Sequence, residues 1–464
     1  MSAPLGVTGG RALGAIFGFR QWQPVKGLDL GSVDIRPAWE SAWVRETIAN
    51  DPAAEAIVSR YLSGLSASGY YPEQQGIWVA EGQFPVAQYQ GNIPRSAASI
   101  TKVATTLAAL ATWGPMHRFE TLVGWQGTIE EGVLNGNLII EGGDDPLFVW
   151  EEAIALGNTL QKLGIRRVTG NLIVANGFNM NFETSSASSG LLLKQALNAP
   201  EWDYAIARSY EEMAPGTPQP TLQIEGQVQI TSDSFKHQAS GWFIRHESLP
   251  LVAVLKAMNI YSNNVMAEQL ASALGGSEAV MSKVEEVTDI SPSEISLSNG
   301  SGLGEENKMS PRAAVTMLQK IQSVLRSSTN ESASGSAGDT PQNFTISDIF
   351  PIAGSDGGTV TDRGLPQNAV VKTGTLAVVS ALAGALPTQK RGVVWFSVLN
   401  YGAGLDGLRS QQDQVISALE KQWGKATEIP LELQTTVRIG ADPYKFGDER
   451  RNQTIYQPHD EKSQ

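Results

Sequence analysis

Ser99 and Lys102 are three positions apart in the motif Ser99-Ile-Thr-Lys102. Residues at i and i+3 of a helix share a face, so the serine hydroxyl and the lysine amine can meet there. A serine becomes a nucleophile when a partner removes its proton, and a lysine can do so when burial or a positive neighbour depresses its pKa. We expect a buried helix and Lys372 to supply these two influences. A solvated lysine one turn after a helix-capping serine is the competing interpretation.

A second hydroxyl belongs to the motif Ser262-Asn263-Asn264, which directly precedes an apolar segment at 265–274. Ser262 could relay a proton between the lysines and a leaving amine, and Asn264 could hold an amide group of a substrate. Serine and asparagine also cap helices well, so simple capping is the alternative interpretation of this motif.

The third motif, Lys372-Thr373-Gly374-Thr375, ends a strand predicted over 368–373. Gly374 would let the backbone approach a ligand closely, and Lys372 with the two threonines would then bind a carboxylate. A strand end with an exposed lysine is the alternative. Each motif is weak by itself, but the three together fall on a helix start, a loop and a strand edge, where this chemistry would need them.

Regular patterns on either side of a central region predict the elements that position these motifs. Apolar residues at helical spacing predict a helix over 52–68, with Asp51 as N-cap and Gly69 as its end, and a buried helix over 96–110. Strand-like runs occupy 76–81, 85–89, 369–373, 378–386 and 393–399, and a closing helix covers 409–423. The pattern indicates one sheet domain that is split by an insertion.

Residues 121–246 differ in texture and predict an inserted, strand-rich α+β module. Short strand candidates at 122–125, 138–141, 168–174 and 221–230 alternate with turns rich in Gly, Asn and Ser, and one helix covers 149–163. Further helices are predicted at 249–258 and 265–274, and a low-complexity loop at 327–342. The expected division is a leader at 1–45, catalytic parts at 46–120 and 247–425 around the insertion, and a tail at 426–464 that is loosely held from about Ala441.

Composition excludes several kinds of chemistry. The 464 residues include no cysteine and four scattered histidines, so cysteine-bound zinc, iron–sulfur clusters and thiol nucleophiles are excluded, and a histidine metal centre is disfavoured. We therefore expect neither a metal nor a cofactor. The formal net charge of −13 and the lack of a basic run argue against nucleic acid as a partner.

The three motifs, in this order, resemble the S-x-x-K, S-D-N and K-T-G set of serine β-lactamases and penicillin-binding proteins, with Asn263 in place of the aspartate. The chain is similar to D-Ala-D-Ala carboxypeptidases of the low-molecular-mass class C penicillin-binding proteins, the penicillin-binding protein 4 type. Supporting signatures are Gly142-Gly-Asp-Asp-Pro146, Asn299-Gly-Ser-Gly-Leu303 and the segment 351–359. The resemblance implies an α+β fold: a serine β-lactamase/transpeptidase-like domain, in which helices flank an antiparallel sheet of about five strands, split by the insertion.

The resemblance also implies the roles of the motif residues in acylation. Ser99 would attack the carbonyl between two terminal D-alanines, with Lys102 as general base and Asn264 as a further catalytic residue. Backbone N–H groups of Ser99 and Thr375 would form the oxyanion hole, where one donor is typically worth about 3–4 kcal/mol. Water would then hydrolyse the acyl-enzyme.

For the leaving group, the resemblance implies that Ser262 and Lys372 pass a proton to the departing D-alanine. Thr373, Gly374 and Thr375 would bind its carboxylate. The implied substrates are peptidoglycan stem peptides ending in D-Ala-D-Ala, with possible endopeptidase activity on cross-links, and β-lactams would form long-lived adducts on the same serine.

Two other functions stay open at this point. A β-lactamase or a serine esterase would keep the fold and change the substrate, and a non-catalytic wall-binding protein would keep only the fold. The family usually reads D-G-S-G-L-S where this chain has Asn299 and Gly304, and Glu305 replaces a basic residue. These departures bear on substrate preference. Asp144 and Asp145 could contact a substrate amine, although a turn-forming role is the simpler interpretation.

The implied substrate predicts an extracytoplasmic location, in the periplasm or cell envelope. The N-terminus supports export poorly, because the apolar run at 12–19 reaches only the lower limit of a signal peptide and is rich in glycine. A poorly ordered leader or the remnant of a targeting segment are both compatible with it. No run approaches the roughly 18 apolar residues of a membrane span, so membrane association is not indicated. The sequence gives no indication of the oligomeric state.

Overall fold

The computed structural model describes residues 51–175, 177–231, 234, 238–332 and 343–455. The predicted leader at 1–45 and most of the predicted loop at 327–342 lie outside these residues. The loop prediction begins too early, because helix α10 (Pro311–Ser332) continues through its first residues.

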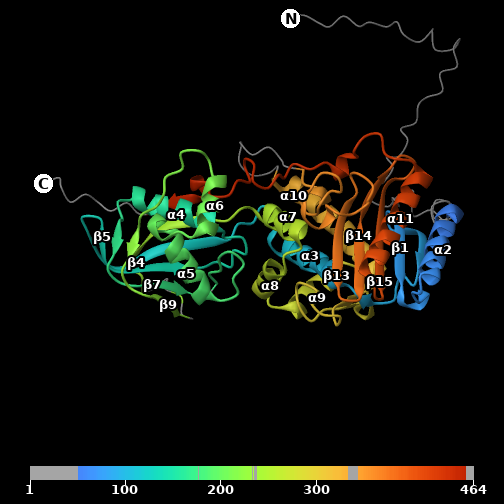
Figure 1. Ribbon diagram of the computed structural model, residues 1–464, viewed down its shortest axis with the longest axis horizontal. Coiled ribbons are helices and arrows are strands. Elements are labelled where there is room, and N and C mark those ends of the chain that lie inside the picture. Colours follow the sequence, from blue (N-terminus) through green and yellow to red (C-terminus); the bar gives the residue numbers. More distant parts are fainter. Residues whose placement is uncertain (1–50, 176, 232–233, 235–237, 333–342, 456–464) are drawn as a thin grey trace, which may run out of the picture. The chain divides into compact units, whose positions relative to one another are not determined.

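A five-stranded sheet forms the framework for the motifs (Figure 1). Its order is β13-β14-β15-β1-β2, and every neighbouring pair is antiparallel, as predicted. The strands are β1 (Gly76–Glu81), β2 (Phe84–Tyr89), β13 (Val370–Leu376), β14 (Val379–Thr388) and β15 (Gly392–Tyr401). The interior strand β14 is buried along its whole length, which means that the sheet is covered on both faces.

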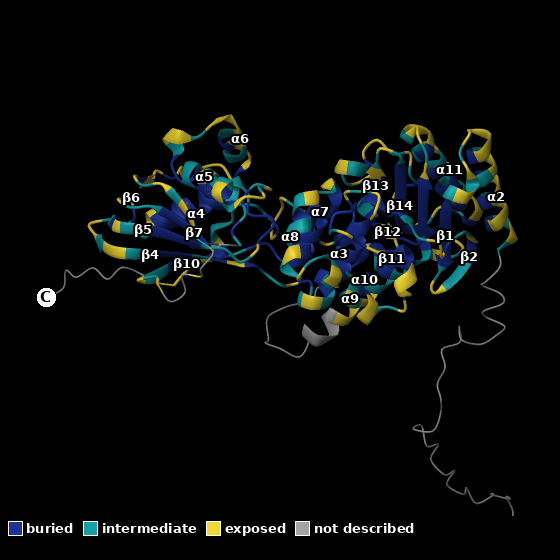
Figure 2. Cartoon of the chain, turned by 90° about the horizontal axis from the view of Figure 1, so that it is seen from below, coloured by how far each residue is buried: buried dark blue, intermediate teal, exposed yellow. Residues whose placement is uncertain are grey.

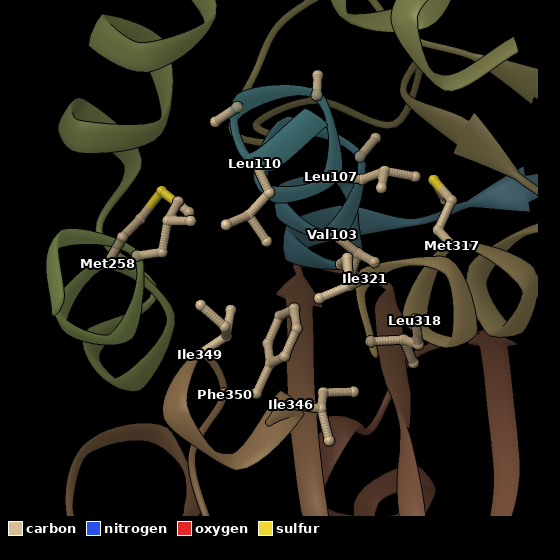
Figure 3. Packing of buried hydrophobic residues seen from close by; sticks show 14 of the residues in the cluster. Val103, Leu107, Leu110, Met258, Met317, Leu318, Ile321, Ile346, Ile349 and Phe350 are labelled. Atoms are coloured by element: carbon tan, nitrogen blue, oxygen red, sulfur yellow. The ribbon is translucent and has the colours of Figure 1, made fainter. Parts of the chain in front are cut away.

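Helices cover the two faces of this sheet. Side chains alternate along a strand, so Val79 of β1 faces the core with helices α2 (Pro52–Ala67) and α11 (Leu405–Trp423), while Ala80 faces the opposite core. That opposite core contains α3 (Thr101–Trp113), α7 (Leu251–Tyr261) and α10. Figure 3 shows Leu107 and Leu110 of α3 in the same cluster as Met258 of α7 and Ile321 of α10. The helix with the first motif is therefore enclosed by apolar side chains.

Asp51 starts helix α2 as the sequence predicts. Its carboxylate accepts hydrogen bonds from the N–H groups of Ala53 and Ala54, and Gly69 follows the helix with a φ of 86°. The same carboxylate forms an ion pair with Arg391 at 2.9 Å, which ties the start of α2 to the turn between β14 and β15.

Most of the predicted insertion folds around a second sheet, which shares no strand with the five-stranded sheet. This eight-stranded sheet consists of β4 (Glu120–Glu130), β5 (Val133–Glu141), β6 (Arg167–Val168), β7 (Leu172–Ala175), β8 (Gln223–Ile224), β9 (Val228–Thr231), β10 (Gly241–Glu247) and β16 (Asn452–Thr454). Besides the predicted helix, seen as α4 (Trp150–Lys162), it is accompanied by α5 (Ser186–Ala196) and α6 (Tyr204–Glu212). Figure 2 shows buried residues along these strands beside intermediate and exposed ones, and the strands have a hydrophobic core of their own. The boundaries at 121 and 246 stay predictions.

The prediction of a loosely held tail is wrong for the described residues after Ala441. β16 pairs with β10, and the buried guanidinium of Arg451 forms an ion pair with Glu152 at 2.6 Å. Gly447 N–H donates to the same glutamate at 3.1 Å. The tail is polar because it supplies partners to buried polar groups, and a polar composition alone does not indicate a mobile segment.

The last elements surround the motifs. Helices α8 (Asn264–Ala273) and α9 (Ser277–Val287) follow α7, and a small sheet joins β3 (Arg95–Ser96), β12 (Lys308–Met309) and β11 (Ile295–Ser296).

Among the described residues, no helix combines the length and apolarity needed to span a membrane. The described part of the chain also contains no group of three His, Asp or Glu side chains suited to a metal ion.

Candidate active site

Ser99 lies in a tight turn at the start of α3. The turn is a short 3-10 helix, η4 (Ala98–Ile100), so the α-helix itself begins at Thr101, later than predicted. Ala98 has a φ of 45°, an unusual value for a residue other than glycine and one that strains the backbone beside the serine. Every residue from Thr101 to Leu110 is buried, as predicted, so the serine is held on a rigid element.

Lys102 is fully buried and its amine has three acceptors. Its Nζ lies 3.1 Å from Ser99 Oγ, 2.7 Å from Asn264 Oδ1 and 2.7 Å from the carbonyl oxygen of Ser301. These three contacts match the three donors of an ammonium group. The interpretation of Lys102 as a solvated surface lysine is therefore wrong.

Burial lowers the pKa of Lys102 to about 7, and the negative charge of Glu268 opposes this effect. A substantial fraction of this amine is neutral at neutral pH, whereas an exposed lysine would be almost entirely charged. A neutral amine in hydrogen-bonding distance of a serine hydroxyl can accept its proton.

Ser262 lies between α7 and α8 and its hydroxyl faces the second lysine. Its φ of 53° places it in the left-handed region at the end of α7, and its Oγ accepts a hydrogen bond from Lys372 Nζ at 2.8 Å. The capping of α8 falls to Asn263, whose side chain accepts a hydrogen bond from the N–H of Met266 at 3.1 Å. The Ser262 hydroxyl is thus not used as a cap.

Lys372 is fully buried in β13, and its Nζ also donates to the carbonyl oxygen of Thr373 at 2.8 Å. Burial, and after it the positive charge of Lys102, lower the pKa of Lys372 well below its ordinary value. The sequence predicts that the charge of Lys372 lowers the pKa of Lys102, whereas burial alone lowers the pKa of Lys102 and the repulsion between the lysines lowers the pKa of Lys372.

Gly374 brings β13 against the backbone of the first motif. A Cβ added at Gly374 would lie 3.0 Å from Ser99 N and 2.9 Å from the carbonyl oxygen of Ala97, so the two backbones would have to move apart to make room for it. The next residue, Thr375, is exposed, and its Oγ1 accepts a hydrogen bond from Arg409 Nη2 at 3.1 Å. The three motifs thus meet at the edge strand of the sheet.

A cavity of about 980 Å³ extends from β13 toward α11 and is lined by Thr359, Thr373, Thr375 and Arg409. Hydroxyl groups and a guanidinium beside a strand edge suit a carboxylate-bearing ligand. A larger cavity of about 1120 Å³ is lined elsewhere by residues such as Trp78 and Thr316. Its lining in the described chain includes none of the three motifs, so we assign it no part in the chemistry.

Asp144 and Asp145 form a turn in the signature at 142–146. Asp145 Oδ1 accepts a hydrogen bond from Leu147 N–H at 2.9 Å, and Asp144 N–H donates to the carbonyl oxygen of Gly177 at 3.0 Å. Burial raises the pKa of Asp145 to about 7. These contacts support the turn-forming interpretation.

Sequence reasoning missed Glu268, Ser301 and Arg409, which contact or support the motif residues. Glu268 lies four positions after Asn264 and so shares its helix face, a spacing that would have drawn attention to it. Ser301 belongs to a recognised signature but accepts from Lys102 through its backbone, which no side-chain pattern predicts. No sequence pattern marks Arg409, because only the folded structure brings α11 beside β13.

Comparison with known proteins identifies the family of this chain. The profile of the D-Ala-D-Ala carboxypeptidase 3 (S13) family matches residues 73–185 and 219–422. D-alanyl-D-alanine carboxypeptidase DacB of Haemophilus influenzae is 25% identical over 406 residues, which cover 66% of this chain and 80% of the relative.

Two solved structures have the same fold. The predatory endopeptidase of Bdellovibrio bacteriovorus, solved acylated by penicillin G, has a TM-score of 0.64 at 23% identity and covers 82% of this chain and 98% of its own. Penicillin-binding protein 4 of Haemophilus influenzae has a TM-score of 0.56 at 21% identity and covers 78% of this chain and 99% of its own. The chain belongs to the D-Ala-D-Ala carboxypeptidase 3 (S13) family and is a serine-type hydrolase of D-Ala-D-Ala peptides.

Proposed function

We propose that Ser99 is the nucleophile of this peptidase and that Lys102 is its general base. Ser99 Oγ forms a bond to the carbonyl carbon of the penultimate D-alanine while its proton passes to the neutral amine of Lys102. Asn264 and the Ser301 carbonyl orient that amine. The backbone N–H groups of Ser99 and Thr375 stabilise the oxyanion.

The second lysine serves the leaving group. As the C–N bond breaks, Ser262 gives its proton to the departing amine and takes one from Lys372, 2.8 Å away, and the proton that Lys102 received from Ser99 replaces it. Thr373, Gly374 and Thr375 form the edge that binds the terminal carboxylate. Water then hydrolyses the ester on Ser99 and regenerates the enzyme.

One observation carries this proposal: the buried Lys102 amine lies 3.1 Å from Ser99 Oγ, and its pKa is about 7. Labelling with a fluorescent penicillin tests it. We expect wild type to form a long-lived adduct, Ser99→Ala to form none and to release no D-alanine, and Ser293→Ala, a change at an exposed serine, to behave as wild type.

Two results would count against the assignment. Labelling of Ser99→Ala at the wild-type level would remove Ser99 as the nucleophile. Rapid turnover of penicillin without a lasting adduct would favour a β-lactamase on the same fold.

We further propose that the same site cleaves D,D-cross-links. The cavity of about 980 Å³ beside β13 is much larger than one alanine, so it can accept a larger leaving group. A relative with this fold is a predatory peptidoglycan endopeptidase. Digestion of purified cross-linked muropeptide dimers tests this: monomers should appear with wild type and not with Ser99→Ala.

Because peptidoglycan lies outside the cytoplasmic membrane, the enzyme acts in an extracytoplasmic location. We propose the periplasm or the cell envelope as that location. Fractionation of cells that express the protein from its native start tests this, with activity expected in the envelope fractions and not in the cytoplasm.

A further inference from the structure

The segment Asn299–Leu303 lies between helix α8 and the turn with the nucleophile. A Cβ added at Gly300 would lie 2.4 Å from the Cβ of Ala271 on α8. At Gly302, which has a φ of 82°, an added Cβ would lie 1.9 Å from the carbonyl oxygen of Ala98. The two glycines therefore let one loop contact α8 on one side and the backbone of η4 on the other.

Peptide groups of this loop connect an acid on α8 to the lysine on α3. The N–H groups of Gly300 and Ser301 donate to the two carboxylate oxygens of Glu268 at 3.1 and 3.0 Å. The carbonyl oxygen of Gly300 accepts from Thr105 Oγ1 at 2.7 Å, and that of Ser301 accepts from Lys102 Nζ at 2.7 Å. The carboxylate thus fixes the loop whose carbonyl group holds the amine.

Helix α8 acts on the same amine a second time. Asn264, one turn before Glu268, accepts directly from Lys102 Nζ at 2.7 Å. Residues four apart on a helix lie on one face, so both side chains point toward the loop and the amine. Asn264 contacts the amine itself, whereas Glu268 acts through the backbone of the loop.

Glu268 also contributes charge. Among the described residues, it is the acid that opposes the effect of burial on Lys102, since its negative charge raises the pKa of that lysine. Lys372 of β13 is the other titratable group that interacts with Lys102, and the positive charge of Lys102 lowers the pKa of Lys372 and so favours its neutral form. Two of the groups that contact the Lys102 amine are neutral: Ser99 Oγ of η4 and the Ser301 carbonyl of the loop.

We propose that Glu268 is a positioning residue for the reaction: it holds the Ser301 carbonyl against the amine of Lys102 and supplies the negative charge that opposes loss of its proton. The proposal rests on the proposed function, in which Lys102 receives the proton of Ser99. It also explains the signature Asn299–Leu303: this loop binds the Glu268 carboxylate through its N–H groups and the Lys102 amine through a carbonyl group.

The test measures the rate constant of Ser99 acylation by penicillin across the pH range around the pKa of Lys102. Only the neutral amine accepts a proton, so the wild-type rate rises with pH through about 7. In Glu268→Gln the negative charge is lost, and we expect the rising limb to move to lower pH by on the order of one pH unit. The plateau rate should fall, because one hydrogen bond to the loop is also lost.

Two variants separate charge from loop structure. Glu268→Asp keeps the charge, so its limb should stay at the wild-type pH even if the rate falls. Thr105→Val removes the bond to the Gly300 carbonyl without a charge, so it should lower the rate and leave the limb in place. Thermal unfolding of each variant shows that it is folded.

The outcomes are distinct. The role of Glu268 would be overturned if the acylation rate of Glu268→Gln rose at the same pH as that of wild type. It would also be overturned if Thr105→Val shifted the rise in rate by as much as Glu268→Gln does. A wild-type enzyme that is not acylated on Ser99 would instead overturn the proposed function, and this inference with it.

Discussion

Two lysines without solvent contact lie at the centre of the site, and each has a fixed set of oxygen acceptors. Burying an amine disfavours its charged form, so both pKa values fall and folding free energy is lost in keeping the lysines there. Lys102 has a carboxylate nearby in Glu268, whereas Lys372 has Lys102 itself as the charge that affects it most. The pair therefore has one amine with a pKa of about 7 and a second amine whose pKa is also well below its ordinary value.

Replacing the second lysine tests this balance of stability and activity. Lys372→Met removes the buried amine and keeps most of its volume, so we expect the free energy of unfolding to rise by about 1 kcal/mol. Acylation by penicillin should fall by roughly 100-fold or more, because the proton path through Ser262 is lost. Thermal unfolding and acylation kinetics measure the two effects, with the exposed lysine variant Lys390→Met as control. Unchanged acylation in Lys372→Met would contradict the role of Lys372.

At the scale of elements, α7 and β13 must be held together, because Ser262 ends the first and Lys372 lies in the second. An ion pair between a buried lysine and a partly exposed aspartate does this. Lys256 of α7 donates to Asp356 Oδ2 at 2.6 Å, and the same oxygen accepts from the N–H of Ile352 at 2.8 Å. The segment around Ile352 pairs with the start of β13, so the ion pair links the two elements that bring Ser262 and Lys372 together.

Breaking this ion pair should destabilise the fold. In Asp356→Asn the shape is kept but Lys256 loses its counter-charge in a buried place, and we expect a loss of about 3–5 kcal/mol in the free energy of unfolding. Lys256→Met should cost less, because Asp356 is partly exposed, and the double variant should be more stable than Asp356→Asn alone. Urea unfolding of the three variants measures this. If the loss of unfolding free energy in the double variant equalled the sum of the losses in the two single variants, the two residues would not stabilise each other.

The elements also show what a sequence can predict. The helix from Asp51 to Gly69 and the hairpin of β1 and β2 depend on local caps and alternation, and both predictions are confirmed. Helices α5 and α6 were missed, since each has few buried apolar residues to set a period. Order and spacing singled out Ser99, Lys102, Ser262 and Lys372, and the fold brings them into hydrogen-bond distance. The spacing of Glu268 from Asn264 could have pointed to that acid, but its contacts with the loop, and those of Arg409 with β13, join distant segments that no local pattern brings together.

At the scale of the whole molecule, residues from distant parts of the chain enclose charged groups of both signs. Arg451, near the C-terminal end of the described chain, pairs with Glu152 of α4, and Asn452 Oδ1 lies 2.7 Å from Nδ1 of the buried His246. Asp145 is buried in the same region, and its pKa is affected by both Glu152 and Arg451. Stability of the folded chain therefore depends on pH through groups outside the three motifs as well as through the motif lysines.

The sign of this dependence follows from the direction of each pKa shift. Lys102 has a lowered pKa, so between about 7 and its ordinary value of 10.5 the unfolded chain binds more protons, and stability rises with pH. Asp145 has a raised pKa, so between 3.8 and about 7 the folded chain binds more protons, and stability falls as pH rises. Together these two groups favour a minimum of stability near neutral pH.

Asp145→Asn tests this dependence, because it mimics the protonated form and can still accept the hydrogen bond from Leu147 N–H. We expect the variant to exceed wild type in free energy of unfolding by a few kcal/mol at pH values above the pKa of about 7, and the difference to shrink steadily as the pH is lowered toward 3.8. Urea unfolding at several pH values measures the difference. Asp362→Asn removes the same charge from an exposed position and should show little change. A difference for Asp145→Asn that does not vary with pH would mean that Asp145 does not titrate with folding.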